Sequence, residues 1–337
     1  RPSRSTLFPY TTLFRSIAKW NGTSWSPIME GESNGVSGIV YSFAVSGTDL
    51  YVGGAFTTAG GHTANRIAKW NGTSWSSLGE GSSNGLNENV RAIGINGNDR
   101  YVGGAFTNAG GQAANYIAKW NGTSWLPLTE NSSNGVNSQV LTLVVMGTDL
   151  FVGGSFSTAG GKNANRIAKW NGTSWSALSE EGYNGLGSTV LSMAVSGTEL
   201  YVGGSFVTAS NKSANYLAKW NGTSWSALID GSFNGLGGSV YSLLVDVASR
   251  KMIVGGSFLT AGSKGVYRIA SFTDADNPFP VELTTFTATV KDNKVNLYWK
   301  TSTEVNNYGF NIERKIDDNI WEEITFEIGR ASCRERV

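Results

Sequence analysis

The chain has 337 residues, with 26 Lys and Arg against 25 Asp and Glu, and it contains one cysteine and one histidine. No basic stripe is present that could neutralise the phosphates of a nucleic acid, so a nucleic-acid partner is not expected. No run of about 18 apolar residues occurs, and we therefore expect no membrane span.

The two ends differ from the rest of the chain. Residues 1–16 resemble the translation of a common sequencing-library adapter, and residues 327–337 resemble the translation of its complementary strand. We therefore leave both segments out of the fold prediction and interpret 17–326 as a fragment of a longer protein. Removing them takes away six of the 26 basic and two of the 25 acidic residues, which leaves 20 against 23. It also removes Cys333, so no disulfide, thiol nucleophile or thiolate metal site is expected.

A repeat of 50 residues dominates 17–273. The segment Ile-Ala-Lys-Trp-Asn-Gly-Thr-Ser-Trp begins at Ile17 and returns at positions 67, 117 and 167 and, with Leu in first place, at 217. Each period contains four short strand signals separated by turn residues, which in one period are 40–45, 50–56, 66–70 and 75–78. Four antiparallel strands per repeat make one propeller blade. The sequence therefore predicts an all-β fold, a β-propeller of four-stranded blades with about five visible.

Each repeat carries two tryptophans on either side of an Asn-Gly turn. Asn-Gly favours a tight reversal, which would bring Trp70 opposite Trp75. A row of such indoles could stack on sugar rings, but their constant place beside a turn favours a structural role. The Gly-Gly pair of the second strand is likewise given a structural interpretation, as a site of close approach between neighbouring strands or as a bulge.

The repeat resembles a known group of proteins. Its segments Val52-Gly-Gly-Ala-Phe-Thr-Thr-Ala-Gly-Gly61 and Arg66-Ile-Ala-Lys-Trp-Asn-Gly72, with their copies, resemble kelch-like propeller repeats, and more closely the repeats common in large exported bacterial proteins. The resemblance covers about 17–272. It implies the architecture and not the function, because one propeller fold hosts many activities.

The repeat stops at a linker, 274–280, and 281–326 has a different composition. This tail contains alternating strand signals at 281–290, 294–300, 309–314 and 320–324. The tail looks like the first half of a fibronectin type III-like sandwich. It also resembles a domain that precedes the sorting signal of proteins exported by the Bacteroidota type IX secretion route. That resemblance implies a secreted or cell-surface bacterial protein.

The last copy of the repeat is incomplete. It contains strand signals at 239–245, 251–258 and 267–272, but no fourth signal. In many propellers the missing outer strand comes from the N-terminus and closes the ring. We therefore expect the natural ring to have six or more blades.

The predicted binding surface is the face that carries the long loops. Alternate connections of a blade emerge on opposite faces, so the loops between strands two and three and the loops after strand four share one face, and loops carry function more often than scaffold. An acidic residue recurs there at Glu30, Glu80, Glu130, Glu180 and Asp230. These carboxylates could form a ring for a cation or a basic ligand. The alternative, which we favour, is exposed ion pairs within one blade, Arg66 with Glu80 and Arg166 with Glu180.

The sequence gives no sign of catalysis. His62 is the only histidine, and its counterparts are Gln112, Lys162 and Lys212, so no His metal site and no Ser-His or Cys-His couple can be assembled. We expect no enzyme activity, no catalytic residue, no cofactor and no metal. A secreted carbohydrate-active hydrolase with a carboxylate pair is the alternative.

Two non-enzymatic roles follow. The chain could be a binding or adhesion module that recognises a glycan or a surface protein on the long-loop face, which predicts loops that depart from the repeat. Tyr183, Phe233 and 210–212 are weak departures of this kind. It could instead be a display scaffold, which predicts nearly identical loops.

Overall fold

A computed structural model describes residues 16–230, 233–246, 251–273, 283–291, 294–301, 310–317, 320–327 and 335–336. Within these residues the regular structure is β-sheet apart from one short 3-10 helix, η1 (Gly81–Ser83). No helix in this part of the chain is long and apolar enough to cross a bilayer. The prediction of an all-β chain is confirmed.

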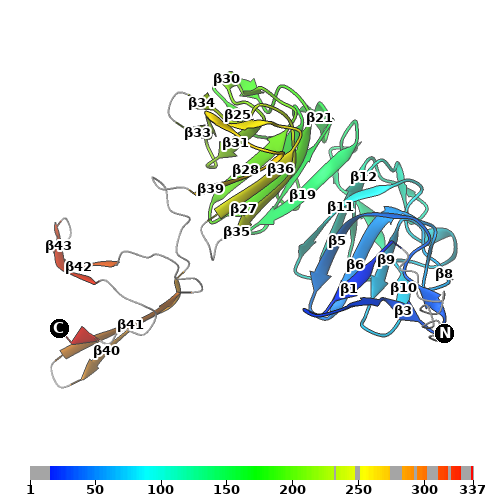
Figure 1. The fold of residues 1–337 in the computed structure, drawn as a ribbon, viewed down its shortest axis with the longest axis horizontal. Coiled ribbons are helices and arrows are strands. Elements are labelled where there is room, and N and C mark those ends of the chain that lie inside the picture. Colours follow the sequence, from blue (N-terminus) through cyan, green and yellow to red (C-terminus); the bar gives the residue numbers. More distant parts are fainter. Residues whose placement is uncertain are drawn as a thin grey trace, which may run out of the picture. The chain divides into compact units, whose positions relative to one another are not determined.

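Antiparallel four-stranded sheets recur along the chain, each with its strands side by side in chain order (Figure 1). The first sheet contains β5 (Ile39–Ser46), β6 (Asp49–Ala55), β9 (Ile67–Trp70) and β10 (Trp75–Ser77). The second contains β11 (Val90–Asn96), β12 (Asp99–Gly104), β15 (Ile117–Trp120) and β16 (Trp125–Pro127). The third contains β19 (Val140–Met146), β20 (Asp149–Gly154), β23 (Ile167–Trp170) and β24 (Trp175–Ala177). The fourth contains β27 (Val190–Ser196), β28 (Glu199–Gly204), β31 (Leu217–Trp220) and β32 (Trp225–Ala227).

A fifth sheet has three strands in the described residues, namely β35 (Val240–Asp246), β36 (Lys251–Gly256) and β39 (Ile269–Thr273). Residues 274–282, which follow β39, lie outside the described residues, so the prediction that the last copy lacks a fourth strand stays a prediction. Ahead of the first sheet, β1 (Ala18–Trp20) and β2 (Trp25–Pro27) form a two-stranded hairpin. The five sheets are the blades of a β-propeller.

The long loops contain small hairpins that the sequence prediction missed. Between strands two and three lie β7 (Thr58–Ala59) with β8 (His62–Thr63), β13 (Asn108–Ala109) with β14 (Gln112–Ala113), β21 (Thr158–Ala159) with β22 (Lys162–Asn163), β29 (Thr208–Ala209) with β30 (Lys212–Ser213), and β37 (Thr260–Ala261) with β38 (Lys264–Gly265). Gly60 and Gly61 form the first of these turns with φ of 55° and 83°. Positive φ at both central residues is what a two-residue hairpin turn requires, so the Gly-Gly dipeptide was the missed signal.

A second set of small hairpins follows strand four. They pair β3 (Met29–Glu30) with β4 (Ser33–Asn34), β17 (Thr129–Glu130) with β18 (Ser133–Asn134), β25 (Ser179–Glu180) with β26 (Tyr183–Asn184), and β33 (Ile229–Asp230) with β34 (Phe233–Asn234). After β10 the helix η1 takes their place. Side chains join the two kinds of loop, since Asn65 Nδ2 donates to Asn84 O at 3.0 Å and Asn84 Nδ2 donates to Thr63 O at 2.9 Å. The loops are therefore held by hydrogen bonds.

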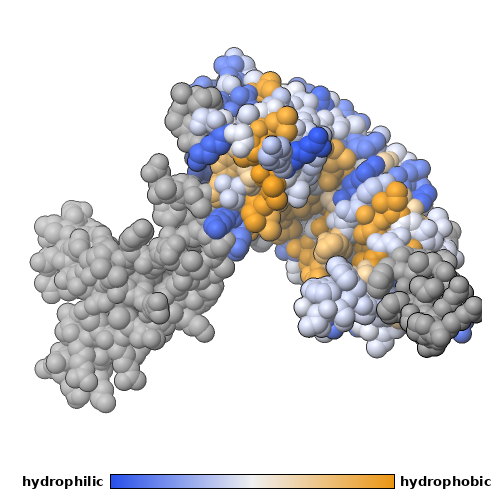
Figure 2. Space-filling model, in the orientation of Figure 1, coloured by the Kyte–Doolittle hydropathy of each residue, from blue (hydrophilic) through white to orange (hydrophobic). Residues whose placement is uncertain are grey.

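Consecutive sheets pack on each other through their first strands, which brings apolar side chains of one sheet onto the glycines of its neighbour. A Cβ on Gly103 would lie 2.3 Å from Val140 Cγ1, so only glycine permits this approach. The first glycine of the pair therefore allows close approach, whereas a Cβ on Gly104 would lie 2.0 Å from Asn89 O of its own sheet, beside the register shift between Val90 and Ala92. In β5, whose outer side faces no four-stranded sheet among the described residues, Phe43 is 66% exposed, whereas its counterpart Ile93 is 8% exposed. Hydrophobic residues accordingly reach the surface over β5 (Figure 2).

The tryptophan pairs have a structural role, as predicted. Trp70 lies opposite Trp75 in the register of β9 and β10, with ring centroids 5.4 Å apart. The second tryptophan of each four-stranded sheet is buried, and the indoles of Trp125, Trp175 and Trp225 donate to a backbone carbonyl of the preceding repeat. These rings therefore pack between sheets and are closed to a ligand.

The tail contains strands where the sequence predicts them. They are β40 (Leu283–Lys291), β41 (Lys294–Thr301), β42 (Phe310–Asp317), β43 (Ile320–Glu327) and β44 (Glu335–Arg336). β40, β41 and β44 form one sheet and β42 and β43 another. That these sheets belong to a fibronectin type III-like sandwich stays a prediction. The linker 274–280 lies outside the described residues.

Candidate functional site

The recurring carboxylate links each repeat to the next sheet. Oε2 of Glu30, Glu130 and Glu180 accepts a hydrogen bond from the backbone N–H of a tryptophan 45 residues later, at 2.7, 2.8 and 2.9 Å respectively. The three donors are Trp75, Trp175 and Trp225. Each of these carboxylates thus ties the loop after strand four to the outer strand of the following sheet.

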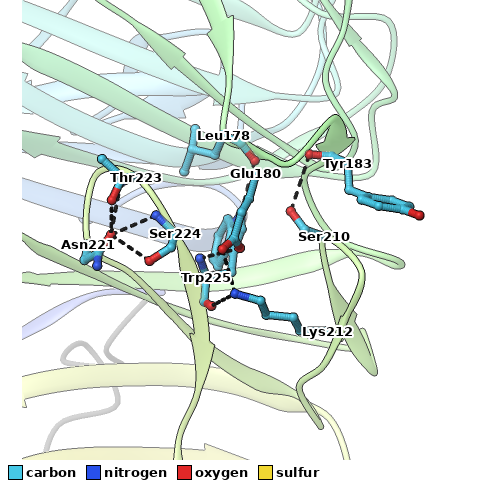
Figure 3. A network of polar contacts seen from close by, with 9 residues as sticks. All are labelled: Leu178, Glu180, Tyr183, Ser210, Lys212, Asn221, Thr223, Ser224 and Trp225. Atoms are coloured by element: carbon cyan, nitrogen blue, oxygen red, sulfur yellow. Dashed lines mark hydrogen bonds and ion pairs between the residues drawn. The ribbon is translucent and has the colours of Figure 1, made fainter.

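The other carboxylate oxygen meets a lysine of the following repeat at two junctions and a histidine at a third. Glu180 Oε1 lies 2.6 Å from Lys212 Nζ, which also donates to Trp225 O at 3.2 Å (Figure 3). Glu130 and Lys162 repeat this pair at 2.6 Å. At the first of these junctions the partner is His62, whose Nε2 lies 3.5 Å from Glu30 Oε1.

The Lys212 ammonium and, next in size, the Trp225 backbone N–H lower the pKa of the Glu180 carboxyl. Lys162 and Trp175 lower the pKa of Glu130 in the same order. Both effects act because hydrogen bonds to the charged form favour it. The Glu180 side chain is only 12% exposed, although the lysine it meets is 51% exposed.

We expect the stability conferred by Glu180 to be lost in acid. A carboxyl whose pKa is lowered by folding contributes stability above its unfolded-state pKa, and this contribution disappears as pH falls through the lowered folded-state pKa. The window therefore lies at and below the ordinary glutamate value of 4.5. The urea midpoints of the wild type and of Glu180→Gln, measured at a series of pH values, should differ at neutral pH and converge below that window. Parallel curves throughout would contradict this assignment.

The predicted pairs within one blade are wrong. Glu180 pairs with Lys212 of the next repeat, and the Arg166 guanidinium donates instead to the carbonyl oxygens of Ser155 and Phe156. The reason is direction: the loop after strand four runs to the neighbouring sheet and not back along its own sheet. Glu80 makes no ion pair with Arg66, and its carboxylate has no hydrogen-bond partner among the described residues.

The site prediction also missed a second recurring ion pair. Within each four-stranded sheet, the acid at the start of strand two meets the lysine of strand three, with N–O distances of 3.4, 3.0, 2.9 and 2.8 Å. The pairs are Asp49 with Lys69, Asp99 with Lys119, Asp149 with Lys169 and Glu199 with Lys219. An acid and a lysine recurring 20 residues apart were the signal.

Glu80 departs from its counterparts because the loop before it has a different backbone. Gly79 has a φ of 100°, and a Cβ there would lie 2.1 Å from Ser83 O. The other copies have Met29, Thr129, Ser179 or Ile229 at this position and form a small hairpin, whereas here η1 follows. Gln112 also replaces the lysine or histidine found at 62, 162 and 212.

A cleft opens where this tie is missing, between the first and second sheets. We call it the Glu80 cleft; its volume is about 640 Å³. It is lined by Ser76, Ser77, Gly79, Glu80, Ser83, Gly110, Gln112, Trp120, Gly122, Thr123, Ser124 and Trp125. Glu80 is the single charged side chain of this lining, which consists of described residues. The cleft therefore combines one carboxylate with the partly exposed indole of Trp120 and several hydroxyl groups.

The five predicted carboxylates are spread over successive junctions. Asp230 lies in β33, and the four glutamates lie at the positions given above. Among the residues that the structure describes, no three His, Cys, Asp or Glu side chains gather as a metal site would require. That the five attract a ligand as a ring stays a prediction.

Comparisons with known proteins concern the fold alone. No protein-family model matches the chain, and no curated protein matches it. Among solved structures, the WD40 β-propeller domain of Doa1 is 12% identical with a TM-score of 0.43, covering 79% of this chain and 80% of that one. The computationally designed Ika4 protein is 14% identical with a TM-score of 0.34, covering 59% of this chain and 98% of that one. A chain of a nidogen/laminin complex is 11% identical with a TM-score of 0.34, covering 70% and 81%.

Proposed function

We propose that this chain is a non-catalytic binding module of an exported bacterial protein, and that it binds its partner in the Glu80 cleft. The departure of Glu80 from the repeat carries the proposal. At three other junctions the same carboxylate ties neighbouring sheets together. At this junction the carboxylate is released from the tie and lines a cleft instead, where it is available to a ligand.

The remaining blades serve in this proposal as a display scaffold. Their loops are nearly identical and hydrogen-bonded, which suits a rigid support better than a variable recognition surface. The kelch-like repeats and the tail's likeness to type IX secretion proteins and to fibronectin type III domains support a place outside the cell. In that location the chain would bind a surface protein or take part in adhesion.

The chemistry of the cleft supports binding over hydrolysis. Glycoside hydrolysis usually requires two carboxyl groups on either side of the scissile bond, one as acid and one as base or nucleophile. The lining of the cleft contains one carboxylate, Glu80. An indole, a carboxylate and hydroxyl groups instead match the mixed apolar and polar lining typical of binding pockets.

The test uses arrays of glycans and of synthetic peptides probed with the intact chain. We expect saturable retention of one ligand class, lost in Ser83→Tyr, which narrows the cleft with the residue found natively at the equivalent Tyr183. Ser133→Tyr places the same ring at the junction between the second and third sheets, outside the Glu80 cleft, and this variant should retain binding. Retention that Ser83→Tyr leaves intact, or release of new reducing ends from retained glycans, would overturn the proposal.

A further inference from the structure

Two other junctions, between the second and third sheets and between the third and fourth, indicate which chemical group the Glu80 cleft would bind. At each of these two junctions a lysine ammonium lies between a carboxylate and a backbone carbonyl. Lys162 Nζ is 2.6 Å from Glu130 Oε1 and 3.1 Å from Trp175 O. Lys212 Nζ is 2.6 Å from Glu180 Oε1 and 3.2 Å from Trp225 O. The repeat thus builds an ammonium site from a glutamate and the second tryptophan.

At the junction of the first and second sheets a glutamate and the second tryptophan are again present, but the lysine is absent. Glu80 and Trp125 both line the cleft, and Gln112, which is neutral, stands at the lysine position. Lys69 and Arg100 line a neighbouring pocket that shares Ser76, Ser77, Trp120 and Gly122 with the cleft. Both cations have other partners, since Lys69 Nζ lies 3.4 Å from Asp49 and Arg100 donates to Ser46 Oγ at 3.0 Å and to Gly97 O at 3.3 Å. The charge of Glu80 is therefore not neutralised from within the described chain.

We infer that the Glu80 cleft binds a lysine side chain of a partner protein. The ammonium would lie against Glu80 and the Trp125 carbonyl, as Lys162 and Lys212 do at their own junctions. The indole of Trp120, which is partly exposed, would cover the aliphatic stem, which long cationic side chains bury readily. An indole face also attracts a cation directly.

A lysine fits the cleft better than a neutral sugar. Both ligands stack on indoles, but a sugar would leave the negative charge of Glu80 without a counter-charge in a partly enclosed site. A sugar hydroxyl and an ammonium can both donate a charge-assisted hydrogen bond to the carboxylate, but only the ammonium also supplies the counter-charge. The inference rests on the proposed function, and it names the lysine side chain as the group of the partner that the cleft recognises.

The test measures binding of a fluorescein-labelled peptide with one central lysine among glycine and serine residues, by anisotropy. Gln112→Lys supplies the ammonium from within the chain, as the native Lys162 and Lys212 do, and should weaken binding about tenfold or more. Glu80→Gln should do the same. Gln139→Lys and Glu88→Gln change the net charge equally at exposed positions outside the cleft, and both should bind like the wild type.

The outcomes separate this inference from the proposed function. Equal binding of the lysine peptide and its Nε-acetylated form, or unchanged binding in Gln112→Lys, would overturn the inference. An array ligand that is lost in Ser83→Tyr but kept in Gln112→Lys would leave the proposed function standing without a lysine. Retention of chitosan oligomers with no retention of lysine peptides would likewise reject a protein partner. Failure to retain any ligand would reject both.

Discussion

Replacing Trp225 by alanine should destabilise the propeller by about 3–5 kcal/mol, the usual cost of removing a large buried aromatic side chain. Trp225 is 1% exposed, and its indole donates to Leu178 O at 3.1 Å, across to the preceding repeat. The substitution leaves both a cavity and a carbonyl without its donor. Urea unfolding followed by circular dichroism should show a lower midpoint for at least the transition that includes the fourth sheet, because repeats unfold in near-neighbour units.

Trp25→Ala is the matched control for this prediction. Trp25 follows the same Asn-Gly-Thr-Ser turn and lies 5.4 Å from Trp20, but it is 60% exposed. Its loss should cost less than about 1.5 kcal/mol, since mainly the contact between the two rings disappears. Equal losses for the two variants would mean that the hairpin motif, and not the packing between sheets, accounts for the stability.

The regular part of the fold could be predicted because its determinants are local. Alternation, turn dipeptides and the 50-residue period placed the strands close to their observed bounds, as 40–45 against Ile39–Ser46 shows. The Asn-Gly turn also gave the correct register of Trp70 and Trp75. Both inferences need only residues within one repeat.

The carboxylate ties could not be predicted in the same way, because they join residues of different repeats. Glu130 and Lys162 are 32 residues apart in loops whose direction the sequence does not specify. A sequence pattern identifies what recurs, but not which neighbouring sheet a loop reaches. The sequence pattern therefore favours a partner within one sheet, Arg166 in the case of Glu180, and does not distinguish Glu80 from its counterparts.

The departure at Glu80 nevertheless has a visible cause in the sequence. Gly79, which precedes the carboxylate, and Gln112, which stands at the lysine position, both differ from their counterparts in the other repeats. Both residues belong to the same junction. Two coincident changes at one junction are a stronger signal than either alone. The two changes can be connected only when the structure shows that the loops carrying Gly79 and Gln112 line the same cleft.

Gly153→Ala should destabilise the chain by about 1–3 kcal/mol, the usual cost of forcing extra volume into a packed interior. A Cβ on Gly153 would lie 2.5 Å from Val190 Cγ1 and 2.8 Å from Thr142 Cγ2. Val190 is fully buried between the third and fourth sheets, so it cannot move aside without separating them. The midpoint of urea unfolding measures this effect.

Gly94→Ala provides the contrast, because it also adds one methyl group to a strand glycine. Its Cβ would lie 3.6 Å from the nearest atom, Leu143 Cβ, which is an ordinary contact, and Ala44 and Ala194 occupy the equivalent positions. Alanine there should leave stability unchanged or raise it by up to about 1 kcal/mol, since glycine is unfavourable inside a strand. If both variants lose stability equally, the Gly-Gly pair serves the backbone conformation of its own strand. A loss confined to Gly153→Ala would show that the first glycine of the pair lets consecutive blades approach.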